Sequence, residues 1–118
     1  VKAAGIRSIN FNEADLITCF ANDYGYENWL AEAIKAYSDP NDLLIAISSS
    51  GMSKNIINGV LQAKTLGNQI ITFSGFNENN ELKKIGNINF WLDSKEYNVV
   101  EMVHHIWLLA IVEEFVTK

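Results

Sequence analysis

The sequence predicts an α/β protein with three layers, in which helices cover both faces of a parallel sheet of about four strands. Two observations predict this fold. Short apolar runs alternate along the chain with helical patterns, and the runs are rich in β-branched residues and almost continuously apolar, as in strands buried on both faces. The length of 118 residues and the hydrophobic content of 48% suit one domain with its own core.

The first half of the chain contains two predicted strands and two predicted helices. A strand over Gly5–Phe11 precedes a short helix over Asn12–Ala21, whose first residue is a suitable N-cap. The helix over Tyr26–Tyr37 has apolar residues on one stripe. The only proline, Pro40, marks the turn before the second strand, Leu43–Ser48.

The second half continues the alternation. A helix over Ser53–Leu66 ends before Gly67, a residue that commonly stops helices. It leads to a strand over Gln69–Ser74, a short helix over Asn79–Ile85 and a strand over Ile88–Leu92.

The last predicted helix, Tyr97–Val116, is the longest and is apolar on almost every side. A helix without a solvated face must be covered by more than its own sheet. In so small a domain a second subunit is the simplest cover. We therefore expect a homo-oligomer, a homodimer or a homotetramer, that assembles through this helix.

Composition excludes several classes of function. The net charge is −5, and no cluster of Lys and Arg offers a surface for nucleic acid. The single cysteine, Cys19, excludes an internal disulfide, and we expect it to pack as a small hydrophobic residue. No apolar run is long enough to span a membrane, and the start lacks the layout of a signal peptide. These features predict a cytoplasmic protein without membrane or nucleic-acid partners.

Four serines and a glycine separate the second strand from the following helix, in the segment LLIAISSSGMSKN. Backbone N–H groups, the positive end of the helix dipole and the hydroxyls of Ser48, Ser49, Ser50 and Ser53 would converge there. Gly51 would allow a ligand close to the backbone. Because ligands of open α/β sheets bind at this edge, we predict an anion site, most simply for the phosphate of a sugar phosphate.

An ordinary loop with a serine N-cap and a solvated Lys54 is the alternative interpretation. One serine fits it well, but four serines with a glycine fit it poorly. Lys54 in the first turn opposes the helix dipole, and a bound anion would reverse that unfavourable effect. The loop is not a Walker loop, because G-x-x-x-x-G-K-[ST] is absent.

Two segments resemble the sugar isomerase (SIS) domain family. The stretch IAISSSGMSKNIINGVLQAKTLGNQIITFSG is similar to the core of that domain, and ANDYGYE within ADLITCFANDYGYENWLAEAIKAY is similar to its phosphoheptose isomerase branch. The resemblance covers residues 5 to 75. It implies a flavodoxin-like fold, a sugar phosphate as the ligand and no cofactor.

The resemblance also assigns residues. It places Ser48, Ser49, Ser50 and Ser53 on the phosphate-binding loop, and it places Asp23 at the substrate. Without the resemblance, an aspartate in an NDYG turn more often caps the backbone of the turn than binds a ligand. Met52 departs from the asparagine that is usual in this loop.

The catalytic residues of the resembled family are only partly matched in this sequence. Members of the resembled family use a glutamate on an early helix and a histidine on the last helix, and the early segment has no counterpart here, so we expect an N-terminally truncated domain. Alignment puts Val100 at the family's glutamine and Leu108 at its histidine. His104 lies on the same helical stripe, one turn earlier, and is our candidate for the acid–base residue.

His105, the neighbour of His104, points about 100° away and is the weaker candidate. Either histidine could instead serve as a cap or a subunit contact. Two adjacent histidines on one helix cannot chelate one metal, so no metal site is expected.

Two functions remain open. The first is a phosphosugar isomerase that interconverts an aldose and a ketose, with a substrate like sedoheptulose 7-phosphate. The second is a non-catalytic SIS module that binds a sugar phosphate or a protein partner and regulates. In either case we expect the 118-residue chain alone to be inactive.

Overall fold

The computed structural model describes residues 2–117. Within them the strands are β1 (Leu43–Ile47), β2 (Gln69–Ser74) and β3 (Ile88–Trp91). The helices are the short 3-10 helix η1 (Lys2–Ala4) and the α-helices α1 (Ala14–Tyr24), α2 (Trp29–Tyr37), α3 (Lys54–Thr65), α4 (Glu81–Ile85) and α5 (Tyr97–Val116).

The three strands form one parallel sheet in the order β1-β2-β3. Ile47 lies beside Phe73, and Phe73 lies beside Phe90, so all three strands end at the same edge. α3 connects β1 to β2, and α4 connects β2 to β3. This arrangement confirms the predicted α/β class with a parallel sheet.

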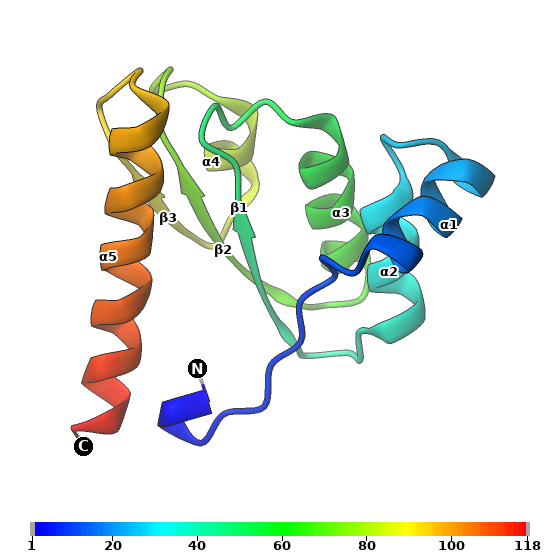
Figure 1. The fold of residues 1–118 in the computed structure, drawn as a ribbon, viewed down its shortest axis with the longest axis horizontal. Helices are drawn as coiled ribbons and strands as arrows, with labels where there is room; N and C mark the ends of the chain where they lie inside the picture. Colours follow the sequence, from blue (N-terminus) through cyan, green and yellow to red (C-terminus); the bar gives the residue numbers. More distant parts are fainter. Residues whose placement is uncertain (1, 118) are drawn as a thin grey trace.

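The first face of the sheet is covered directly by α3 and α4, while α2 packs on α3 and α1 packs on α2 (Figure 1). Ala46 and Ile70 point from the strands into a core completed by α2, α3 and α4. The buried members of this core are Trp29, Leu30, Ile34, Ala46, Val60, Ala63, Ile70 and Leu82.

Within residues 2–117, α5 is the helix that lies on the second face, and η1 packs against α5 (Figure 1). Phe73 of β2 stacks on Phe90 of β3 with ring centroids 4.8 Å apart, and Trp107 of α5 lies against both rings. α5 thus packs over β2 and β3. On this face of β1 the side chains of Leu43, Ile45 and Ile47 stay exposed.

The strand predicted over Gly5–Phe11 is wrong, because this segment has no strand partner and forms irregular structure. Ile6 and Ile9 are exposed, and Phe11 packs against the helical core instead. The sheet of the described chain therefore has three strands and not four.

Two smaller predictions at α1 are also wrong. The N-cap position of α1 is occupied by Glu13 and not by Asn12, without a side-chain capping hydrogen bond, and the helix runs on to Tyr24. Cys19 is exposed, because the inward stripe of α1 is formed by Leu16, Ile17, Phe20 and Ala21. The other predicted elements appear at or within two or three residues of their expected bounds, and α5 matches them at both ends. No helix in the described part of the chain is long and apolar enough to cross a membrane.

Candidate anion-binding site

The predicted serine loop lies between the end of β1 and the start of α3, at the carboxyl edge of the sheet. The backbone fixes its shape. Ser48 N–H donates to the Phe73 carbonyl oxygen at 3.0 Å, Gly51 N–H donates to the Ser48 carbonyl oxygen at 3.0 Å, and Gly75 N–H donates to the Ser49 carbonyl oxygen at 2.8 Å. Gly51 has a φ of 66°, a left-handed conformation that glycine adopts without strain.

Several N–H groups of the loop are left without an acceptor. Among the described residues, nothing accepts from the backbone N–H groups of Ser49, Ser50 and Ser53. In α3 the first backbone bond runs from Ile57 N–H to the Ser53 carbonyl oxygen, and Ser53 makes no side-chain cap. The N–H groups of residues 54–56 therefore also lack an intrahelical partner. Together these donors suit an anion.

The hydroxyls of the loop make three separate contacts. Ser48 Oγ donates to Ser53 Oγ at 3.1 Å, and Ser50 Oγ accepts from Met52 N–H at 3.2 Å. Ser49 Oγ donates to a carboxylate oxygen of Glu101 on α5 at 3.5 Å. The structure thus joins the hydroxyls of Ser48 and Ser53, whereas Ser49 is bonded to a residue of the opposite layer and Ser50 to the backbone of its own loop.

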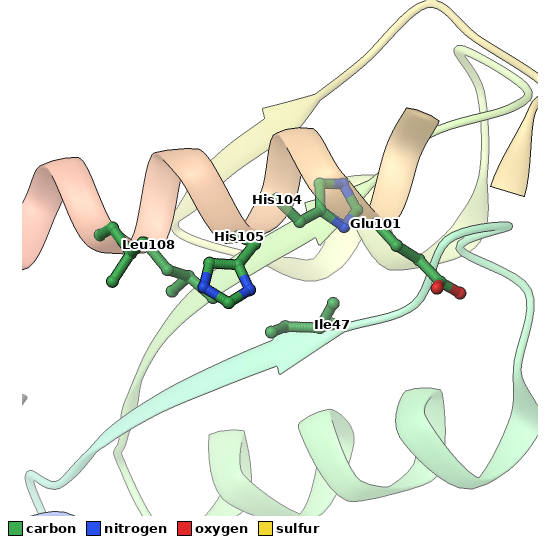
Figure 2. Close-up of a pocket in the computed structure, with 6 residues that line it drawn as sticks. Ile47, Glu101, His104, His105 and Leu108 are labelled. Atoms are coloured by element: carbon green, nitrogen blue, oxygen red, sulfur yellow. The ribbon is translucent and has the colours of Figure 1, made fainter. Parts of the chain in front are cut away.

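Next to the loop, a pocket opens between β1 and α5 (Figure 2). Its lining residues are Ile47, Glu101, His104, His105, Leu108 and Leu109. Figure 2 shows Glu101, His105 and Leu108 following one side of α5 above Ile47. The pocket is mostly apolar, with the titratable groups toward the serine loop.

Glu101 is the residue at this site that the sequence analysis did not consider. The sequence could have indicated Glu101, because it lies four residues before His105 and residues at this spacing share one face of a helix. The carboxylate next to Ser49 opposes the binding of an anion. A ligand at Ser49 would have to displace Glu101 or form a hydrogen bond to it.

His104 lies deep in the protein and is 2% exposed. Its Nε2 is 3.0 Å from the Ser74 carbonyl oxygen, so this nitrogen carries the proton and donates it. The ring is held edge-on against Phe73 and beside Trp107. Nδ1 is buried without a hydrogen-bond partner in the described structure, which leaves one basic nitrogen beside the pocket.

Asp23 lies apart from this constellation. It is exposed near the end of α1, and its carboxylate accepts a hydrogen bond from the neighbouring Asn22 amide at 3.1 Å. No contact of the described residues joins Asp23 to the serine loop. Within residues 2–117, no three His, Cys, Asp or Glu side chains cluster as metal ligands would.

Fold and loop together define the class: an open parallel α/β protein with a serine-rich loop at the carboxyl edge of its sheet. A family model described as SIS domain matches residues 2–75, so the chain belongs to this family. This confirms the resemblance seen in the sequence.

Known relatives carry the name phosphoheptose isomerase. The chain is 34% identical to the enzyme of Fusobacterium nucleatum over 106 residues, which are 90% of this chain and 54% of the relative. It is 31% identical over 119 residues to the enzyme of Helicobacter pylori strain HPAG1, covering 97% of this chain and 62% of the relative. The chain thus spans little more than half the length of these relatives.

Two solved structures share the fold. The phosphoheptose isomerase of Francisella tularensis superposes with a TM-score of 0.83 at 24% identity, and covers 91% of this chain and 57% of its own. The phosphoheptose isomerase of Neisseria gonorrhoeae superposes with a TM-score of 0.85 at 19% identity, and covers 91% and 59%.

Proposed function

We propose that this chain is the sugar-phosphate-binding part of a phosphosugar isomerase, with a substrate like sedoheptulose 7-phosphate. One observation carries the proposal. The N–H groups of Ser49, Ser50 and Ser53 and the start of α3 leave a set of donors without acceptors at the carboxyl edge of a parallel sheet. The names of the relatives supply the substrate class. Asp23 is proposed to contact the sugar, on the resemblance alone.

Proton transfer between the two sugar carbons needs a base beside the phosphate site. His104 is our candidate, and its free Nδ1 is the atom that would accept the proton. The pocket beside the serine loop would hold the sugar. Because Leu108 lines this pocket and His104 is 2% exposed, the 118-residue chain alone should turn substrate over negligibly.

The presence of Leu108 in the pocket and the burial of His104 also favour a second function, a non-catalytic SIS module that binds a sugar phosphate. A histidine that is locked to the Ser74 carbonyl and wedged between aromatic rings serves the core as well as it could serve catalysis. The two functions share the phosphate site and differ only in the chemistry beside it.

Calorimetric titration separates phosphate recognition from general sugar binding. We expect the chain to bind sedoheptulose 7-phosphate and not unphosphorylated sedoheptulose, because the site recognises the phosphate. Equal binding of both, or of neither, would contradict the proposal.

A turnover assay then separates isomerase from binding module. In the protein encoded by the full open reading frame that contains this chain, His104→Gln should reduce kcat by a factor of about 10² or more and leave KM nearly unchanged. Unchanged turnover would remove His104 from the mechanism, and no turnover in the wild type would favour the binding module.

We also propose that the chain is part of a longer protein that completes the sheet beside β1. β1 is one of the two edge strands of the described sheet, and its Leu43, Ile45 and Ile47 are exposed. An apolar, unpaired edge is a liability that proteins usually cover. The chain also spans only 54% to 62% of the relatives above.

Finally, we propose a homo-oligomer that assembles through α5. The helix leaves a stripe of exposed apolar residues, Val99, Met102, Ile106 and Leu109, with the alternating spacing of three, four and three that is typical of paired helices. Val116 lies seven residues after Leu109 and extends the stripe past Glu113.

A further inference from the structure

Asn80, at the start of α4, is the most completely bonded polar side chain near the serine loop, and the proposed function does not use it. Only 1% of it is exposed. Its Nδ2 donates to Ser74 Oγ at 3.0 Å, to the Asn77 carbonyl oxygen at 2.9 Å and to the Gly75 carbonyl oxygen at 3.3 Å. Its Oδ1 accepts from Lys83 N–H at 2.9 Å and so caps α4.

The Asn80 side chain also lies directly behind the serine loop. A Cβ atom placed on Gly51 would overlap Oδ1, Cγ and Cβ of Asn80. Gly51 is held from the same side, because Leu82 N–H donates to the Gly51 carbonyl oxygen at 3.0 Å. The absence of a side chain at residue 51 is therefore required by Asn80 as well as by the positive φ.

Asn80 joins the two segments that hold the loop. One is the end of β2, where Gly75 N–H donates to the Ser49 carbonyl oxygen, and the other is the start of α4, which binds the Gly51 carbonyl oxygen. Both loop carbonyls are thus engaged on the side of β2 and α4. A carbonyl oxygen that pointed at a bound anion would repel it. Because the carbonyl oxygens of Ser49 and Gly51 are bonded to β2 and α4, the N–H groups of Ser49 and Ser50 stay available to the anion.

We propose that Asn80 is a positioning residue that fixes the serine loop in its donor-presenting shape from behind. The role of Asn80 in phosphate binding rests on the proposed function. Its effect on the hydrogen bonds that hold the serine loop can be measured without a ligand. Asn80 itself, being buried, would not touch the phosphate.

Asn80→Ser separates positioning from helix capping, since serine is also a good N-cap but cannot reach Ser74, Gly75 and Asn77 together. Asn68→Ser is the matched control. Asn68 is also buried, and its amide donates to Ser38 Oγ at 2.6 Å, a contact made outside the loop. Asn80→Ser loses two or three of the hydrogen bonds that Asn80 Nδ2 donates, and we expect its phosphate affinity to be about tenfold weaker than that of the wild type. We expect the affinity of Asn68→Ser to be unchanged.

Amide hydrogen exchange tests the link in the absence of phosphate. The N–H groups of Gly51, Gly75 and Leu82 should exchange at least about tenfold faster in Asn80→Ser than in the wild type, and not in Asn68→Ser. Unchanged exchange at these three amides would overturn the proposal whether or not phosphate binds. Faster exchange in Asn80→Ser together with no phosphate binding by the wild type would instead overturn the proposed function.

Gly51→Ala tests the same contact from the loop side, should Asn80→Ser fail to fold. Its control is Gly67→Ala, because Gly67 has a similar φ of 79° but nothing within 4 Å of an added Cβ. Both variants carry the backbone strain, and only Gly51→Ala meets Asn80. Weaker phosphate binding and faster exchange in Gly51→Ala alone support the positioning role, and equal behaviour of the two variants contradicts it.

Discussion

Glu101 is a single side chain with opposing effects on the site. Its carboxylate accepts a hydrogen bond from Ser49 Oγ at 3.5 Å, and its charge repels the anion that the loop is proposed to bind. Two unit charges about 4 Å apart interact by about 1 kcal/mol in water, so this repulsion is large enough to measure.

Glu101→Gln should therefore strengthen phosphate binding by about twofold to fivefold at low salt, and the gain should shrink as salt screens the charge. The measurement is a phosphate titration at two ionic strengths. Glu27→Gln changes the net charge equally, on an exposed residue of the α1–α2 turn, and should leave affinity unchanged. Weaker binding in Glu101→Gln would mean that the carboxylate orients Ser49 for the ligand.

At the residue level, the sequence supports a prediction where the residues are neighbours in the chain. Ser48 to Ser53 are neighbours in the sequence, so their position in one loop followed from one strand–loop–helix pattern. The contact between Ser49 and Glu101 joins residues 52 positions apart and depends on how α5 lies over the sheet. The sequence places Asn80 only within the helix predicted over Asn79–Ile85, and its N-cap role and its packing against Gly51 appear in the structure.

α5 is the element with the largest unpartnered apolar surface. Ile106 and Leu109 are 59% and 58% exposed, whereas Val100 and His104 of the same helix are buried against the sheet. The helix thus has a face used within the chain and a second apolar face without a partner among the described residues.

Ile106→Glu combined with Leu109→Glu should dissociate the proposed oligomer without unfolding the domain, because both side chains lie outside the core. Sedimentation velocity at micromolar concentration measures the mass, and circular dichroism checks the fold. Leu61→Glu, which places a charge on the exposed side of α3, should leave the assembly intact. A wild type that sediments as a folded monomer would refute the assembly.

At the element level, the spacing of apolar residues and the residues that begin or end helices predicted helices α2 to α5 and the three strands of the described sheet. The exception, Gly5–Phe11, shows what periodicity omits. A strand needs a neighbour to satisfy its backbone, and the described chain places none beside this segment.

The whole molecule is a sheet with one well-covered face and one partly open face. Helices α3 and α4 cover the first face and α5 lies on the second (Figure 1). On the second face Leu43, Ile45 and Ile47 of β1 are exposed. The pocket and the serine loop both lie at the end of this open strip. Additional polypeptide or a second subunit beside β1 would therefore complete the wall of the proposed sugar site.

The central claim is that the serine loop binds phosphate, and the melting temperature in inorganic phosphate at constant ionic strength tests it most directly. A ligand at ten times its Kd stabilises the folded state by about 1.4 kcal/mol, which raises the melting temperature of a domain of this size by about 5 °C. We expect this rise in the wild type and in the control Ser8→Ala with Ser38→Ala, whose hydroxyls lie outside the loop. Ser50→Ala with Ser53→Ala should abolish it. An unchanged melting temperature in the wild type, or an equal rise in the loop variant, would contradict the account.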